Sequence, residues 1–160
     1  MIKGAIATVL IFLSSAAFAA DAGKLVLPGD ITIVQAEKVI AAAKVKAKEQ
    51  GTLMNIAVLD AGGNLKAFAR MDGAFLGSID ISMKKAKTAR YFNMSSKELG
   101  DLAQPGKPLY GIEATNDGLA IFGGGELLRD ASGVIIGAVG VSGGSVEEDM
   151  GVAKAGVAGL

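Results

Sequence analysis

The sequence contains no cysteine, no histidine and no tryptophan among its 160 residues. Without cysteine, neither a disulfide nor a thiol nucleophile is available. Without histidine, the chain lacks the usual general base at neutral pH and the commonest metal ligand, which excludes histidine-dependent triads and typical zinc sites. Aromatic residues make up only 5% of the chain, which argues against platforms that stack nucleic-acid bases.

Acidic and basic residues are balanced, with 16 of each. No basic excess indicates a nucleic-acid partner, and no acidic tail indicates a partner attracted by charge. The length suits one domain with a real hydrophobic core. The chain shows no internal repeat or low-complexity segment, so we expect a single folded domain over residues 31–160.

The first residues have the pattern of a signal peptide. A lysine near the start precedes an apolar run, and Ala17-Phe18-Ala19 matches an A-x-A cleavage site. The apolar run is short and rich in small residues, so an uncleaved membrane anchor is the less favoured alternative. We therefore predict a signal peptide over residues 1–19, a flexible arm over 20–30, a periplasmic or secreted protein, and no membrane contact after cleavage.

Hydrophobic spacing predicts helices and hairpins in alternation. A capping box at Thr32 and Gln35 starts a helix that stops at Gly51, and "LMNIAVLD" and "LKAFARMD" form a hairpin around "DAGGN". Two further helices are expected, one capped by Ser78 and one beginning at Ser95.

The second half of the chain begins with a long polar loop over residues 104–118. Strands are then predicted at "LAIFG", "ELLR" and "VIIGAVGVSG", and a last helix begins at Val146. Hairpins instead of crossovers imply an antiparallel sheet flanked by helices, which is an α+β sandwich.

The glycine-rich stretch before that last helix is not a phosphate site. Its glycines do not match G-x-G-x-x-G, and no Lys-Ser/Thr pair follows them. Ser145 and Glu148 form a capping box, and the acidic first turn already supplies the negative charge that a helix N-terminus attracts.

Arg70 and Asp72 are the first candidate ligand-binding residues. They lie where a predicted strand gives way to a glycine loop. The arginine can clamp a carboxylate with two N–H groups, and Asp72 can orient the ligand or take a proton. The alternative is an ion pair that only fastens the loop.

A second candidate is the basic stripe on the predicted second helix, formed by Lys84, Lys85, Lys87 and Arg90. A solvated helix face is the default interpretation of such a stripe. Lys87 is the member that we expect to turn inward, where a lysine at a pocket wall pairs with an anion.

Residues 123–125 are three consecutive glycines, which allow a ligand or a neighbouring chain to approach the backbone closely. Glu126 follows as a candidate proton carrier, with a solvated carboxylate on an edge strand as the alternative. Tyr91 and Tyr110 are the only phenols, and either could ligate iron weakly.

In combination, these segments resemble the GlcG/HbpS-like proteins, which include small haem-binding and haem-degrading proteins and a domain attached to some cobalamin adenosyltransferases. The resemblance covers about residues 31–159 and rests on "NIAVLDAGGNLKAFARMDGA", "SIDISMKKAKTA", "RDASGVIIGAVGVSGG" and "EEDMGVAKAG". It implies a profilin-like fold with an antiparallel sheet, helices on both sides and oligomeric assembly. It also implies that Gly143-Gly144 is a turn that brings the last strand close to "MDGA".

By the same resemblance, the ligand pocket maps onto Arg70, Asp72, Lys87, Gly124, Gly125 and Gly143. The chain departs from the family pattern at residues 126 and 127, where glutamate and leucine replace a motif that often ends in proline. Members that hold haem iron through histidine are not a template here. Haem therefore remains a candidate cofactor that we expect to bind weakly.

Three functions compete on this evidence. The favoured one is an exported, homo-oligomeric binding protein for haem or another anionic organic molecule. The second is an enzyme acting on a small organic acid, with Asp72 or Glu126 as base and Arg70 as carboxylate clamp. The third is a structural oligomer without a ligand.

Overall fold

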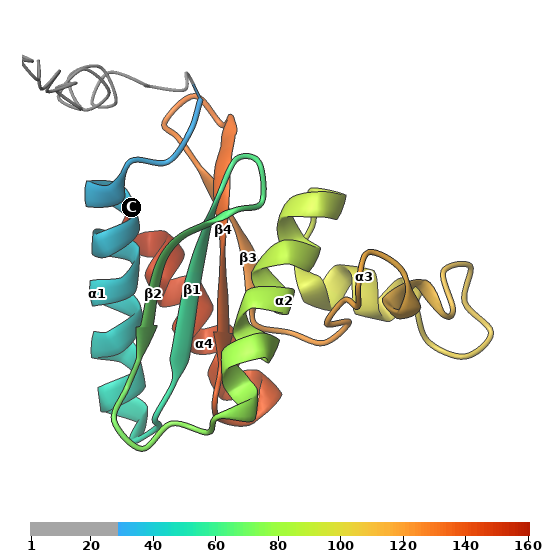
Figure 1. Cartoon of the computed structure of the whole chain (residues 1–160), viewed down its shortest axis with the longest axis horizontal. Coiled ribbons are helices and arrows are strands. Elements are labelled where there is room, and N and C mark those ends of the chain that lie inside the picture. Colours follow the sequence, from blue (N-terminus) through green and yellow to red (C-terminus); the bar gives the residue numbers. More distant parts are fainter. Residues whose placement is uncertain (1–28) are drawn as a thin grey trace, which may run out of the picture.

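A four-stranded antiparallel sheet is the centre of the structure (Figure 1). The computed structural model describes residues 29–160. Along the sheet the order is β2-β1-β4-β3, with every neighbouring pair antiparallel. The strands are β1 (Asn55–Asp60), β2 (Leu65–Arg70), β3 (Gly125–Arg129) and β4 (Ile135–Ser142). The predicted antiparallel α+β class is confirmed.

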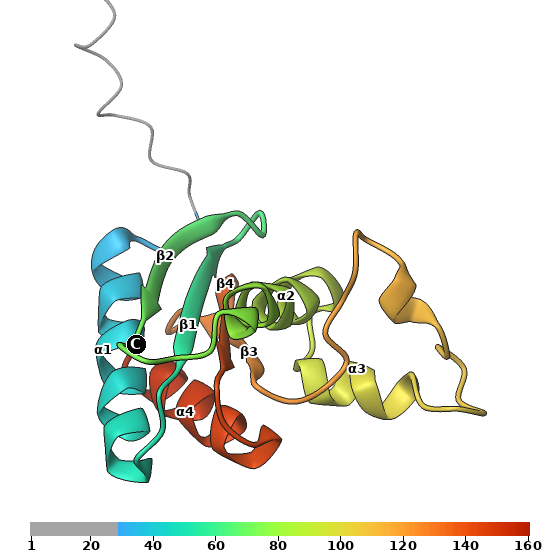
Figure 2. The same ribbon diagram turned by 60° about the horizontal axis from the view of Figure 1, so that its bottom comes forward.

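The helices cover both faces of this sheet. On one face, α1 (Ile33–Gln50) and α4 (Val146–Ala158) pack against each other and the strands, whereas α2 (Gly77–Phe92) lies across the other face. The shorter α3 (Ser96–Leu102) follows α2. Together with a loop that contains the 3₁₀ helix η3 (Ile112–Ala114), it projects away from the sheet in both ribbon views (Figures 1 and 2).

Small residues let α1 and α4 approach each other closely. Their buried faces consist mainly of alanine, valine and glycine, and a Cβ on Gly156 would already press on Val39. The strand side chains that meet these helices are larger and β-branched, namely Ile56, Val58, Val139 and Val141. This layer is the main hydrophobic core.

Two strand glycines set the distance between α2 and the sheet. A Cβ on Gly140 would overlap the carbonyl oxygen of Ser82, and a Cβ on Gly125 would overlap that of Lys85. Since no side chain fits at either position, α2 rests directly on the backbones of β3 and β4. The glycines of this part of the chain therefore serve helix packing.

The predicted capping boxes at Thr32 and Ser145 are confirmed, and the helix predicted to begin at Ser95 starts with a third. Thr32 with Gln35, Ser95 with Glu98 and Ser145 with Glu148 cap α1, α3 and α4 by reciprocal hydrogen bonds. The predicted cap at Ser78 is wrong, because α2 begins at Gly77 and its first residues make no side-chain cap. Ser78 is instead a buried residue in the first turn of α2.

The predicted strand at residues 119–123 is also wrong. Its backbone groups bond to helical residues instead of a neighbouring strand: the Ala120 N–H donates to the Thr88 hydroxyl at 3.1 Å, and the Phe122 carbonyl accepts from Ser96 at 2.7 Å. An apolar run is buried here without joining the sheet.

Residues 1–28 lie outside the described part of the chain. The predicted signal peptide and most of the predicted arm fall there. Among residues 29–160, none of the helices combines the length and the apolar composition that crossing a bilayer requires.

Candidate ligand-binding site

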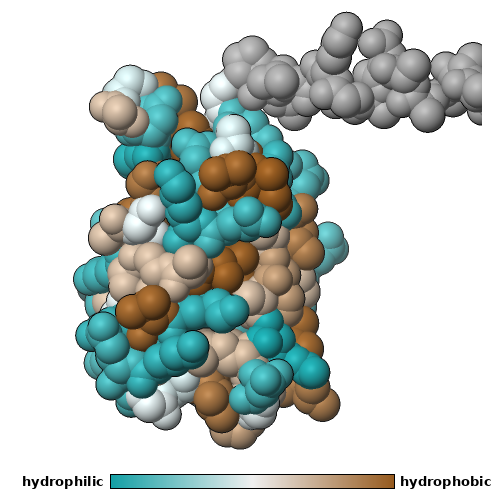
Figure 3. Space-filling view, turned by 90° about the vertical axis from the view of Figure 1, so that its left-hand side faces the viewer, coloured by the Kyte–Doolittle hydropathy of each residue, from teal (hydrophilic) through white to brown (hydrophobic). Residues whose placement is uncertain are grey.

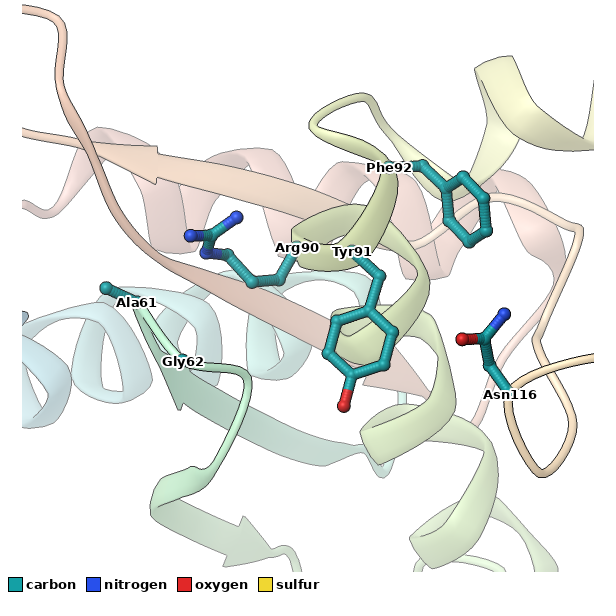
Figure 4. Close-up of a pocket in the computed structure, with 6 residues that line it drawn as sticks. All are labelled: Ala61, Gly62, Arg90, Tyr91, Phe92 and Asn116. Atoms are coloured by element: carbon teal, nitrogen blue, oxygen red, sulfur yellow. The ribbon is translucent and has the colours of Figure 1, made fainter.

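A hollow of about 440 Å³ opens between the end of α2, the β1–β2 hairpin and the loop at residue 116 (Figure 4). We call it the α2 hollow; its lining residues are Ala61, Gly62, Arg90, Tyr91, Phe92 and Asn116. A second depression of about 310 Å³ adjoins it along α2. Lys87 lines the second depression and donates to the carbonyl oxygen of Asn116 at 2.9 Å, so the two hollows share a wall.

The hairpin turn positions the Tyr91 ring. Gly63 has a φ of +83°, and a Cβ there would come within 2.5 Å of the Tyr91 ring carbon Cε1. Only glycine satisfies both the backbone conformation and the contact. The aromatic ring of Tyr91 on α2 thus packs directly on the backbone of the turn between β1 and β2.

One cation lies beside this ring, and a second lines the same hollow. The ammonium of Lys87 lies 5.3 Å from the centre of the Tyr91 ring, which is within range of a cation–π interaction. Arg90 donates one hydrogen bond, from Nη1 to the side chain of Asn93 at 2.8 Å. Its Nε is shielded from solvent and has no acceptor within the described residues, which is an unfavourable state for a charged donor.

Tyr91 is the only tyrosine among the residues that line the two depressions. The side chain is 44% exposed, and its hydroxyl makes no hydrogen bond to the described part of the chain. In Figure 4 the ring stands between the hairpin at Ala61–Gly62 and the loop at Asn116. Tyr110, the other phenol, lies outside the lining of both depressions.

Of the two depressions, only the second has acidic residues in its lining. Asp80 pairs with Lys84 at 2.8 Å, and Asp117 lines the same wall. The α2 hollow itself has no carboxylate in its lining, so it presents Arg90 and the nearby ammonium of Lys87 to a ligand. The arrangement favours an anionic ligand with a flat or apolar body.

The structure does not gather the predicted site residues into one pocket. Arg70 and Asp72 line a different hollow with Leu53 and Met71, at the end of β2 away from the hairpin. Five residue steps separate Arg70 from the hairpin end of its strand, roughly 17 Å at ordinary strand geometry. Lys87 lies beside the hairpin, so a small ligand cannot touch both residues in one chain.

The predicted glycines Gly124 and Gly125 are buried and face this chain's own side chains and backbone. A Cβ on Gly124 would crowd Lys85 and Asp149, and one on Gly125 would overlap the α2 backbone. The close approach that these glycines permit is therefore made by α2 and α4. Whether either glycine also contacts a ligand stays a prediction.

Gly143 lies against the segment that leads into β1. A Cβ there would overlap the carbonyl oxygen of Leu53, and Met54 in turn accepts the backbone N–H of Met71 at 3.0 Å. The turn therefore brings the end of β4 towards the "MDGA" segment, in agreement with the turn that the resemblance implies. Its contact with a ligand stays a prediction.

The second helix turns a different lysine inward from the one predicted. Lys85 is fully buried, whereas Lys87 remains partly exposed. Lys85 forms an ion pair with buried Asp149, donates to the Val141 carbonyl at 3.0 Å, and lies 4.7 Å from the centre of the Phe122 ring. Burial lowers the pKa of Lys85 and raises the pKa of Asp149, and their pairing opposes both changes.

Helical spacing carries a signal for this pair that the sequence analysis missed. Ser78, Ser82, Lys85 and Ala89 recur every three or four residues and form the sheet-facing side of α2. On α4 the buried residues are Asp149, Val152, Ala153 and Gly156. Val146, the first residue of the helix, is 36% exposed and lies off this face.

Glu126 lies on β3, the sheet edge opposite β2. Burial raises its pKa, with Glu98 adding to the rise and Lys154 opposing it. Three strand spacings, about 14 Å, separate β3 from the β2 edge that carries Arg70. Within one chain, Glu126 therefore cannot serve as base for a substrate held by Arg70; Asp72 remains beside that arginine.

A family model described as "Haem degrading protein HbpS-like" matches residues 31–158. The chain belongs to the HbpS-like family. The resemblance to GlcG/HbpS-like proteins is thereby confirmed, including the relation to a domain of cobalamin adenosyltransferases.

Three relatives illustrate this family membership. An uncharacterised 15.0 kDa protein of Citrobacter freundii, from the dhaT-dhaS intergenic region, is 44% identical over 74% of this chain and 84% of its own length. The corrinoid adenosyltransferase PduO of Salmonella typhimurium is 40% identical over 74% of this chain, but only 35% of that protein is matched. A crystal structure of a PduOC–haem complex superposes with a TM-score of 0.78 and 35% identity, covering 82% of this chain and 95% of the other.

Haem is named both in the description of the family model and in that of the PduOC crystal structure. The donors of the α2 hollow fit a haem through a phenol and two cations. Tyrosine is a known axial ligand of haem iron, and the guanidinium of Arg90 suits a carboxylate. Within residues 29–160, no cluster of three acidic, histidine or cysteine side chains offers an alternative metal site.

Proposed function

We propose that this protein binds haem, or another flat anionic organic molecule, in the α2 hollow. The observation that carries the proposal is the Arg90 guanidinium in a hollow whose lining includes the Tyr91 ring and no carboxylate. A ligand carboxylate there would pair with this guanidinium, whose Nη1 also donates to the side chain of Asn93. Lys87, held by Asn116 at the shared wall, supplies a second cation.

Each residue has a separate role towards haem. The Tyr91 phenol would hold the iron, and Arg90 and Lys87 would hold the propionates. Bound haem would supply a redox-active iron. Tyr91 supplies the only candidate iron ligand among the residues that line the hollow. The affinity for haem therefore depends largely on the propionate contacts and on apolar contact with the Tyr91 ring. We therefore expect weak binding.

A titration of untagged protein with haem, followed by visible absorption, tests the proposal. Arg90→Ala should weaken binding about tenfold or more, since a charge-assisted hydrogen bond is lost. Arg129→Ala is the matched control, because Arg129 lies on β3 and bonds only the Gly133 carbonyl. Equal affinities of wild type and Arg90→Ala would refute the site.

The iron ligand is tested separately by Tyr91→Phe, with Tyr110→Phe as its control. Loss of the phenol should change the visible spectrum of the ferric complex, whereas the Tyr110 variant should keep it. A spectrum typical of two imidazole ligands cannot come from a chain without histidine and would indicate a purification tag.

We further infer that the protein is exported and works as a homo-oligomer. Export is supported by the pattern of residues 1–19. Association is supported by the open sheet edges β2 and β3 and by large exposed apolar side chains on the described surface, including Phe75 (71% exposed), Leu76 (70%) and Tyr110 (67%). N-terminal sequencing of the protein from the periplasmic fraction should begin at Ala20, and a sequence beginning at Met1 would contradict export.

A further inference from the structure

The hollow that Arg70 and Asp72 line has a volume of about 440 Å³ and lies between the C-terminal half of α1 and the end of β2. We call it the α1–β2 hollow. Its lining residues are Lys44, Lys48, Leu53, Arg70, Met71 and Asp72. Figure 3 shows the α1 side of the molecule, where hydrophilic side chains surround smaller apolar areas.

The cations of this hollow are unpaired. Lys44, Lys48 and Arg70 make no ion pair or side-chain hydrogen bond with residues 29–160, unlike Lys46, Lys66, Lys84 and Lys97, which all have carboxylate partners. Asp72 is the single acid in the lining, so three positive charges and one negative leave a net charge of two positive.

The helix and the strand that carry these exposed side chains are held in place by backbone hydrogen bonds. Lys44 and Lys48 lie four residues apart on one side of α1, where like charges repel. Arg70 pairs with Asn55 in the sheet register, and the next residue, Met71, donates its N–H to the Met54 carbonyl at 3.0 Å. Repulsion among cations held by a helix and a sheet is relieved when an anion binds between them.

Asp72 gives the hollow a second requirement. An ionised aspartate only accepts hydrogen bonds, so it repels a ligand that is anionic throughout. It attracts a ligand that presents a hydroxyl beside its negative groups. Leu53 and Met71 add an apolar surface for the carbon skeleton.

We propose that the α1–β2 hollow binds a small hydroxylated polyanion, with at least two negative charges on the cations and a hydroxyl donating to Asp72. Hydroxy-polycarboxylates and sugar phosphates share this chemistry. The site is separate from the α2 hollow, because Arg70 and the hairpin lie at opposite ends of β2.

The test uses two pairs of probes that differ by the hydroxyl, measured by calorimetry on the full-length mature protein. Citrate is compared with tricarballylate, which lacks the hydroxyl, and propane-1,2-diol 1-phosphate is compared with propyl phosphate, which also lacks it. Whichever acid class fits, the hydroxylated member of its pair should bind several-fold more tightly. The class with the higher affinity identifies the ligand as a carboxylate or a phosphate.

Variants then assign the contacts. Arg70→Ala should weaken binding of the better probe about tenfold, and Arg70→Lys should restore only part of it. Asp72→Ala should remove the preference for the hydroxylated probe and improve binding of the other one. Lys46→Ala is the matched control, since Lys46 lies on the same helix but pairs with Glu49 outside this hollow.

Several results would overturn the proposal. They are no binding of any probe at millimolar concentration, equal weakening by Lys46→Ala and Arg70→Ala, and an unchanged hydroxyl preference in Asp72→Ala. Arg90→Ala should leave probe binding intact, and Arg70→Ala should leave haem binding intact. The two sites can therefore fail independently, and a change in light scattering on adding probe would instead assign the hollow to contacts between copies.

Discussion

Replacing Lys85 with methionine tests the buried ion pair that joins α2 to α4. Methionine has a similar length and keeps the apolar stem, so few packing contacts change. The substitution removes the ammonium from Asp149, the Val141 carbonyl and the Phe122 ring at once. Asp149 then keeps one described donor to its side chain, the Gly144 N–H at 3.0 Å.

The magnitude follows from burial. The Lys85 side chain is 0% exposed and that of Asp149 is 4% exposed, so the orphaned carboxylate cannot turn to water. Breaking a buried pair on one side costs about 3–5 kcal/mol, a large share of the roughly 5–15 kcal/mol that stabilises a domain. The same change at Lys97, whose pair with Asp101 is 51% and 65% exposed, should cost less than about 0.5 kcal/mol.

Urea unfolding of Lys85→Met, Asp149→Asn and the double variant measures the coupling of the two residues. The double variant should be more stable than the sum of the single losses predicts, by about 2 kcal/mol or more, because neither charge remains. Burial raises the pKa of Asp149 above its unfolded value. The defect of Lys85→Met should therefore shrink as the pH falls, since the folded state then binds the proton more readily. A single-variant loss below about 1 kcal/mol would refute this account.

Three further outcomes are expected. Gly140→Ala should destabilise the fold by about 2 kcal/mol or more, because the added methyl meets the Ser82 carbonyl; an unchanged melting temperature would show that α2 can move away. Asp30→Asn should lower stability at neutral pH: burial opposes ionisation, but the N–H of Ala61 and the ammonium of Lys66 lower the pKa of Asp30 below its usual value. This contribution is complete above the unfolded pKa and lost as the pH falls through the folded one, so wild type and variant should converge in acid. Light scattering at micromolar concentration should give a homo-oligomer, and a monomer would contradict the proposed assembly.

Local patterns in the sequence predict much of the fold. Capping residues such as Ser145 and Glu148 lie only three residues apart in the chain, and the glycine turn of the hairpin has its own short-range chemistry. The irregular conformation of residues 119–123 could not be predicted in the same way. Their apolar character marks burial, but the choice between a strand and an irregular segment is made by Thr88 and Ser96, which are distant in sequence.

The site was harder to predict because it depends on which side chains face each other. Helical spacing places Lys85 on the sheet-facing side of α2, but lysine is rarely buried, and its partner Asp149 comes from a helix 64 positions away in the sequence. Arg70 was correctly placed at a strand end, but its neighbours Lys44 and Lys48 come from α1. No spacing rule connects residues that meet only after the helix packs on the sheet.

Tyrosine fluorescence gives the most direct test of ligand binding in the α2 hollow. The chain has two tyrosines and no tryptophan, so Tyr110→Phe leaves Tyr91 as the single fluorophore, and Tyr91→Phe leaves Tyr110. Haem bound against the Tyr91 ring should quench the fluorescence of the Tyr110→Phe protein at up to one equivalent of haem. The fluorescence of the Tyr91→Phe protein should be much less affected. Equal quenching of the two proteins, or stronger quenching of Tyr110, would contradict binding in this hollow.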